Sequence, residues 1–116
     1  NEMENYIAWL DSAVSKLKEE QKELENSSRA DEANFAKVRI NVLEICKTVF
    51  GVFKKVKTQD EFDAEYLKKL AELREAWEDS HSKADEHGDV KKSIVEGIKL
   101  ETLAEAEKKF KELGGN

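Results

Sequence analysis

The chain has 116 residues, of which 40% are charged, 39% are apolar, five are glycine and none is proline, and this composition favours long helices in one domain over residues 1–116. The net charge of −6 opposes nucleic-acid binding, because lysine and arginine supply most of the affinity for phosphates. No apolar run approaches the ~20 residues of a membrane-spanning helix and no signal peptide is predicted, so we expect neither nucleic acid nor membrane as a partner.

The first predicted helix covers residues 3–24. Its apolar residues recur at alternating steps of four and three, the heptad spacing of a helix that buries one side. Trp9 lies at the edge of this stripe, where an indole can pack on one side and stay solvated on the other. The segment ENSSRAD interrupts the pattern and predicts Ser27 or Ser28 as the N-cap of the next helix. The stripe consists of Met3, Ile7, Leu10, Val14, Leu17, Gln21 and Leu24.

The second predicted helix runs from about Arg29 to Lys57 and carries two adjacent stripes. At roughly 100° per residue the stripes cover about half of the circumference, so we expect this helix to contact at least two others. Its many β-branched residues also suit strands, but a run of about 20 residues with helical spacing is too long for one. The first stripe is Phe35, Val38, Val42, Ile45, Val49, Val52 and Val56, and the second is Leu43, Cys46, Phe50 and Phe53.

Two further helices complete the chain. The segment TQDE predicts a capping box at the start of the third helix, in which Thr58 and Glu61 exchange hydrogen bonds. In EHGD, Gly88 suits the left-handed residue that ends this helix, and Asp89 suits the N-cap of the fourth. The expected buried residues are Phe62, Tyr66, Leu70, Leu73, Trp77 and Ala84 in the third helix and Ile94, Val95, Ile98, Thr102, Ala106, Phe110 and Leu113 in the fourth.

Four helices joined by short turns predict an all-α, up-down-up-down antiparallel four-helix bundle. The second helix is basic and its neighbours in sequence are more acidic, which favours this order. Cys46 is the only cysteine, so no disulfide can form within the chain, and its place in an apolar stripe predicts a buried, unreactive thiol. We therefore expect the cytoplasm as the compartment.

Charged residues within the apolar arcs are the first candidates for function. Arg39 projects between Leu43 and Cys46, and Arg74 and His81 project toward the apolar face of the third helix. These residues can be structural, as ion pairs or as side chains that extend to solvent. The alternative is a pocket in the bundle interior where Arg39, Arg74 and His81 bind a small anionic ligand, since guanidinium groups bind carboxylate and phosphate bidentately.

A metal site is a further alternative with less support. Glu78 and His81 are one turn apart, as in the Glu-x-x-His segments of di-iron bundles, and Asp85 could add a third ligand. Those bundles need the segment on two helices and this chain has one copy, so we expect no cofactor. The sequence also lacks a phosphate-binding glycine loop and a serine in a G-x-S-x-G turn, so we expect no catalytic residues and no enzyme activity.

Four apolar residues project away from the predicted stripes: Trp9, Ile40, Leu100 and Leu103. We expect them to contribute to an exposed patch or a subunit interface. The sequence therefore favours a non-catalytic interaction or regulatory module whose partner is another protein or a second copy of the chain in a homodimer. The alternative is the bundle that binds a small anionic ligand or a metal through polar residues in its interior.

The runs DEANFAKVRINVLEICKTVF and SIVEGIKLETLAEAEKKF resemble a family of small all-helical bacterial proteins that has no established activity. The similarity covers most of the chain from the second helix onward, and it rests on core positions together with Asn34, Arg39 and Glu101. The resemblance implies a compact bacterial helical domain and carries over no functional residue.

Overall fold

The computed structural model describes residues 2–114, apart from the side chains at positions 2, 59 and 114. The chain forms four α-helices and ends in a short π-helix, and no strand occurs between residues 2 and 114. The predicted all-α four-helix fold is therefore confirmed. None of these helices combines the length and the apolar content needed to cross a lipid bilayer. The elements are α1 (Glu2–Asn26), α2 (Ala30–Val56), α3 (Gln59–Glu86), α4 (Val90–Lys109) and the π-helix η1 (Phe110–Gly114).

Two of the three turns follow the predicted capping chemistry. At the start of α3, the Thr58 hydroxyl accepts a hydrogen bond from the Glu61 N–H, and the Glu61 carboxylate accepts one from the Thr58 N–H. At the α3–α4 turn, Gly88 adopts a φ of +68°. Asp89 then caps α4 by accepting a hydrogen bond from the Lys92 N–H at 3.1 Å. Local sequence signals therefore set both ends of α3 and the start of α4.

The α1–α2 turn corrects the predicted cap. Neither Ser27 nor Ser28 caps α2; the N-cap is Arg29, whose side chain makes no capping hydrogen bond. Ser28 instead takes the left-handed conformation, at φ 58°, that closes the end of α1. Its N–H donates to the Glu25 carbonyl, and the Arg29 N–H donates to the Leu24 carbonyl, the pair of bonds that ends many helices. The serine is therefore used to end one helix and cannot cap the next.

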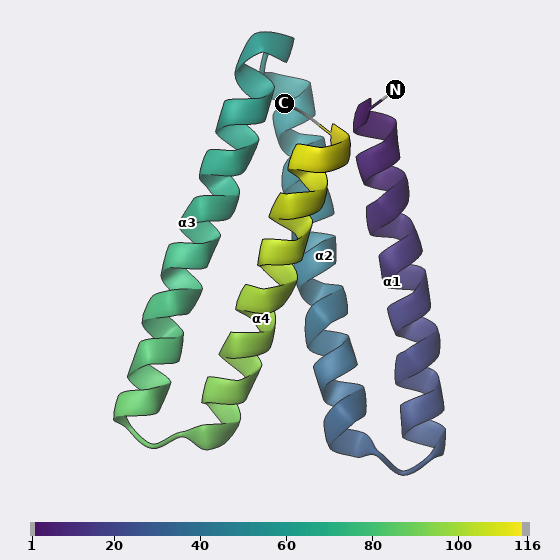
Figure 1. The fold of residues 1–116 in the computed structure, drawn as a ribbon, viewed down its shortest axis with the longest axis vertical. Helices are drawn as coiled ribbons and strands as arrows, with labels where there is room; N and C mark the ends of the chain where they lie inside the picture. The colour runs from purple at the N-terminus through teal and green to yellow at the C-terminus, as the bar shows by residue number, and fades with distance from the viewer. Residues whose placement is uncertain (1, 115–116) are drawn as a thin grey trace.

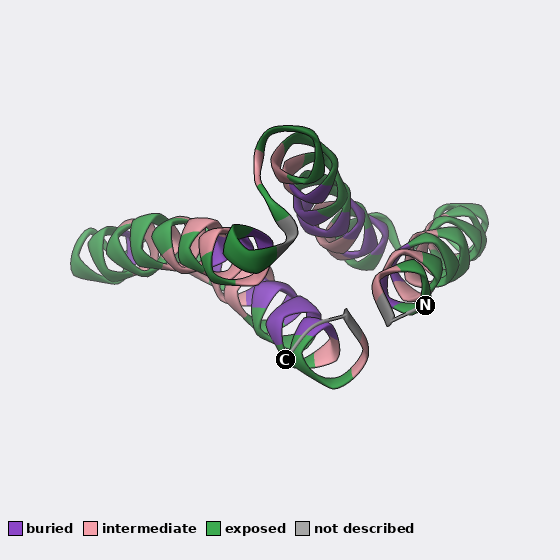
Figure 2. Ribbon diagram, turned by 90° about the horizontal axis from the view of Figure 1, so that it is seen from above, coloured by how far each residue is buried: buried purple, intermediate pink, exposed green. Residues whose placement is uncertain are grey.

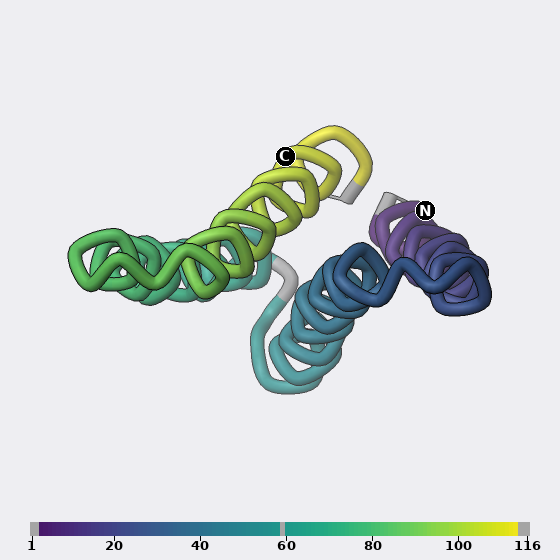
Figure 3. The backbone as a smooth tube through the Cα atoms, turned by 90° about the horizontal axis from the view of Figure 1, so that it is seen from below, coloured from purple at the N-terminus to yellow at the C-terminus, as the bar shows by residue number. Residues whose placement is uncertain are grey.

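The four helices form two antiparallel hairpins that converge at one end and separate at the other. Helix α1 pairs with α2, and α3 pairs with α4. The start of α1, the π-helix η1 and the α2–α3 turn lie at the convergent end, whereas the other two turns lie far apart at the opposite end (Figure 1). Seen along this axis, α2 and α4 lie between α1 and α3 (Figures 2 and 3). Helix α2 packs against α4 more extensively than against α3, so the bundle is flattened, with extents of 45 × 34 × 21 Å.

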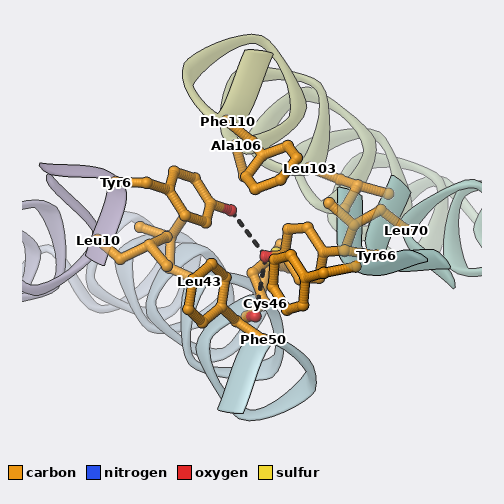
Figure 4. Close-up of a cluster of buried hydrophobic side chains, with 12 residues drawn as sticks. Tyr6, Leu10, Leu43, Cys46, Phe50, Tyr66, Leu70, Leu103, Ala106 and Phe110 are labelled. Atoms are coloured by element: carbon orange, nitrogen blue, oxygen red, sulfur yellow. Dashed lines mark hydrogen bonds between the residues drawn. The ribbon is translucent and has the colours of Figure 1, made fainter. Parts of the chain in front are cut away.

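The core is built around aromatic rings at the convergent end (Figure 4). The Tyr6 hydroxyl lies 2.8 Å from the Tyr66 hydroxyl, which in turn donates to the Cys46 carbonyl at 2.9 Å. Since the single proton of Tyr66 goes to Cys46, Tyr6 is the donor to Tyr66, and both buried phenols are satisfied. The rings in contact have centroids 4.8–6.4 Å apart and belong to Tyr6, Phe50, Phe62, Tyr66 and Phe110.

Cys46 lies in this core and is fully buried. Burial raises the pKa of its thiol to about 12, with the negative charge of Glu107 adding to the effect. A thiol with so high a pKa is protonated at neutral pH and is a poor nucleophile. The predicted burial of Cys46 is therefore confirmed.

The buried arc of α2 differs from the predicted one. Of the first predicted stripe, Ile45, Val52 and Val56 are exposed, at 38%, 51% and 67% of their surface. Their place in the core is taken by the opposite edge of the helix, where Ala33 and Ala36 are buried. The cause is the splayed arrangement: α2 turns toward α1 and α4, and α3 leaves it after the convergent end.

The predicted apolar patch does not form on the surface. Ile40 and Leu103 are 4% and 0% exposed, so both belong to the interior and cannot contribute to an exposed interface of this chain. Trp9 and Leu100 are half-buried. In the opposite sense, Ile94 was expected in the core and is 47% exposed. These errors have one origin, since a helical projection gives the spacing of residues and does not say which side the neighbouring helices cover.

Candidate functional site

Arg39 lies in a cleft between α1, α2 and α4, named here the Arg39 cleft. Its volume is about 280 Å³, near the lower limit of small-molecule sites. Helix α1 provides a wall that is apolar apart from Lys16, and α4 provides a polar wall. Arg39 is half-buried. The lining residues are Trp9, Ala13, Lys16, Leu17, Arg39, Leu43, Glu101, Thr102 and Glu105.

Four charged side chains line the Arg39 cleft without pairing. Lys16 and Arg39 come from α1 and α2, and Glu101 and Glu105 come from α4. Among the residues that the structure describes, none of the four has a hydrogen-bond or ion-pair partner. Opposite charges that face one small cavity and remain apart are available to a bound molecule.

Arg74 does not join Arg39 in this cleft. It donates a hydrogen bond to Glu107, a residue of α4 whose side chain is 12% exposed. This hydrogen bond raises the pKa of the Arg74 guanidinium further above its ordinary value. The pair ties α3 to α4 and supports the structural interpretation of Arg74, and the predicted clamp of Arg39 with Arg74 is wrong.

His81 takes part in a contact between the two helices next to the α3–α4 turn. Its Nδ1 lies 3.7 Å from Oδ2 of Asp85, and its Nε2 lies 3.3 Å from Oγ of Ser93. Ser93 also donates to Oδ1 of Asp85 at 2.5 Å. Glu78 is not part of this group, and nowhere in residues 2–114 do three His, Cys, Asp or Glu side chains gather as metal ligands. The candidate metal site of Glu78, His81 and Asp85 therefore does not form, and His81 does not reach the Arg39 cleft either.

Ser93, His81 and Asp85 are also the residue types of a hydrolase triad. In such a triad the serine hydroxyl donates to the histidine, which removes its proton. Here the hydroxyl donates to Asp85, and the imidazole is 3.7 Å from the carboxylate that would orient it. Ser93 is therefore a cross-link between α3 and α4 and is not activated as a nucleophile.

A second surface was not predicted and lies on another side of α2, named here the α2 stripe. It contains no charged residue and extends for about 33 Å at 1.5 Å per residue. A shallow hollow of about 520 Å³ lies along it, lined by Asn41, Glu44, Ile45, Thr48 and Val49. The α2 stripe consists of Asn34, Val38, Asn41, Ile45, Thr48, Val49, Val52 and Val56.

One feature of the sequence could have revealed the α2 stripe. The two apolar stripes predicted on this helix cover about half of its circumference, more than one flattened bundle can bury. Asn34, Asn41 and Thr48, seven residues apart, continue the same side of the helix, and the next residue in this series is Lys55. In a chain with 40% charged residues, an uncharged series from residue 34 to residue 48 is a signal in its own right.

Comparisons with known proteins found no matching family model, no matching curated protein and no matching solved structure.

Proposed function

We propose that this protein is a non-catalytic helical module that acts by protein–protein contact, with the α2 stripe as its contact surface. The observation that carries the proposal is the exposure of Ile45, Val52 and Val56 on one side of α2. Contiguous exposed apolar surfaces of this kind mark interaction sites in soluble proteins.

The partner we propose for the α2 stripe is a second copy of this chain. Val38, Ile45 and Val52 are β-branched residues seven apart, the spacing and shape that suit a two-helix seam. Polar Asn41 and Thr48 alternate with them, and such polar positions fix the register of a seam. A short, partly polar seam predicts a weak homodimer and not an obligate one.

Charge favours an antiparallel arrangement of the two α2 helices. Glu44 and Lys55 border the α2 stripe on the same side, and neither is paired within the described residues. In a two-fold arrangement centred between Thr48 and Val49, Glu44 lies about half a turn from Lys55 of the other copy. In a parallel arrangement, Glu44 and Lys55 of the other copy would lie on opposite faces of the seam and about 16 Å apart along it, so this contact would not form.

Sedimentation equilibrium over a roughly hundredfold range of concentration tests this proposal. We expect a monomer–dimer equilibrium for the native chain and a monomer for Val52→Glu. The matched control is Val90→Glu, which places the same charge on an exposed valine of α4 and should leave the dimer intact. Glu44→Lys should weaken the dimer, and adding Lys55→Glu should restore it. A native chain that stays monomeric, or a dimer that survives Val52→Glu, would refute self-association through the α2 stripe.

A further inference from the structure

The Arg39 cleft has the features of a binding site that is independent of the α2 stripe, with which it shares no residue. Arg39 is half-buried and has no partner among the described residues. Removing a charge from water without a partner is unfavourable, so a side chain in this position gains from any anion that reaches it. The first requirement of a ligand is therefore a carboxylate or a similar group for Arg39.

The opposite wall of the cleft limits the choice of ligand. Glu101 and Glu105 also face the cavity unpaired, and they repel a molecule that carries only negative charge. A molecule with only positive charge meets Arg39 and Lys16 and is repelled in the same way. A ligand that satisfies both walls carries an anionic group and a cationic group a few ångströms apart.

The remaining lining is apolar. Trp9, Leu17 and Leu43 form this part of the surface together with Ala13. A volume of about 280 Å³ admits a small molecule and excludes a folded segment of chain. We propose that the Arg39 cleft binds a small zwitterion of the amino-acid class with an apolar side chain. Its carboxylate contacts Arg39, its ammonium contacts the glutamates of α4, and its side chain lies against Trp9.

Such a ligand would connect the two hairpins. Arg39 belongs to the α1/α2 hairpin, and Glu101 and Glu105 belong to the α3/α4 hairpin. A zwitterion held by both therefore braces the two hairpins against each other. Because it binds only the folded chain, it raises the melting temperature as its concentration rises.

Calorimetric titration of the native chain with L-leucine and with L-phenylalanine tests the proposal. We expect saturable binding by at least one of them. N-acetyl-leucine lacks the cation and leucinamide lacks the anion. Each should bind at least roughly tenfold more weakly than leucine. Arg39→Gln and the double variant Glu101→Gln/Glu105→Gln should lose binding. The matched control is Lys37→Gln, which removes an exposed charge from α2 outside the cleft and should bind as the native chain does.

Trp9 supplies a second readout. In a Trp77→Phe variant it is the only tryptophan, and the zwitterion should change its emission with the same affinity that calorimetry gives. No heat or emission change with either amino acid up to about 10 mM would overturn the proposal. Equal binding of leucine and N-acetyl-leucine would overturn the proposal of a zwitterionic ligand and would indicate a site for anions. Unchanged binding in a folded Arg39→Gln variant would remove the site from this cleft.

Discussion

Alkaline pH should unfold this protein through three buried groups. Tyr6, Tyr66 and Cys46 are 0% exposed, and burial raises the pKa of each above its ordinary value. In the unfolded chain the thiol titrates near ~8.5 and the phenols near ~10. Above those values the unfolded state loses protons that the folded state keeps, so the free energy of unfolding falls as the pH rises. Below about pH 8 all three groups are protonated in both states, and their contribution to stability is complete.

The expected loss is large compared with the stability of a small domain. Each group that keeps its proton only in the folded state lowers the free energy of unfolding by about 1.4 kcal/mol for each pH unit above its unfolded pKa. Near pH ~11, still below the Cys46 pKa of about 12, the loss is about 3 kcal/mol from Cys46. Each tyrosine adds between about 1 and 2 kcal/mol, which brings the total to about 6 kcal/mol. Since small domains have about 5–15 kcal/mol of stability, we expect a cooperative transition in this region of pH.

The tyrosinate absorbance band measures the effect directly, because Tyr6 and Tyr66 are the only tyrosines. We expect tyrosinate absorbance and the loss of helical circular dichroism to follow one transition above pH ~10. The control is the double variant Tyr6→Phe/Cys46→Ala, which keeps the bond from Tyr66 to the backbone carbonyl and should lose stability more slowly with pH. Tyrosinate that forms near pH ~10 while the helices stay intact would refute the assignment of both phenols to a closed core. If the free energy of unfolding fell equally steeply with pH in the native chain and in the double variant, the assignment of the alkaline transition to these buried groups would be refuted.

Two further predictions concern single contacts and are tested by urea unfolding. Arg74→Met leaves Glu107 buried without its partner and should cost about 1–3 kcal/mol, whereas the double variant Arg74→Met/Glu107→Leu should recover most of the loss. A double variant as unstable as the single one would contradict the role assigned to Arg74 as the partner of a buried Glu107. Gly88→Ala should cost about 1 kcal/mol because φ is +68°, whereas Gly51→Ala, with free space around the added methyl group, should stabilise the helix by about 0.5–1 kcal/mol. Equal effects at the two glycines would contradict the conformational argument.

The local part of the fold could be predicted from the sequence. The capping box at Thr58 and the left-handed Gly88 follow from residues within one turn of each other, and both are found where the spacing places them. The all-α class follows from periodicity over more than 20 residues in each helix. The failure at Ser28 has a local cause as well, because the same serine could end one helix or begin the next, and the backbone conformation decided between them.

The tertiary part could not be predicted in the same way. Periodicity predicted a buried Ile45 and an exposed Ile40, and the positions of the other helices produced the reverse. The sequence was sufficient to identify Arg39 as a candidate, because the side of a helix on which a residue lies depends only on its position in that helix. The partner of Arg74 depends on Glu107, which lies 33 residues further along the chain. A projection of a single helix cannot show a contact between two helices.

Helix α2 connects the fold with both proposed sites, since three of its sides have different surroundings. Cys46 and Phe50 face the aromatic core, Arg39 faces the cleft, and Ile45 and Val52 face solvent. The free energy of unfolding should therefore depend mainly on the first side, which packs in the core formed with the aromatic rings of α1, α3 and η1. Substitutions on the other two sides should change binding and leave unfolding nearly unchanged, because no buried contact is lost. The Arg39→Gln and Val52→Glu variants are accordingly expected to fold, and each should lose only the binding event assigned to its own side of α2.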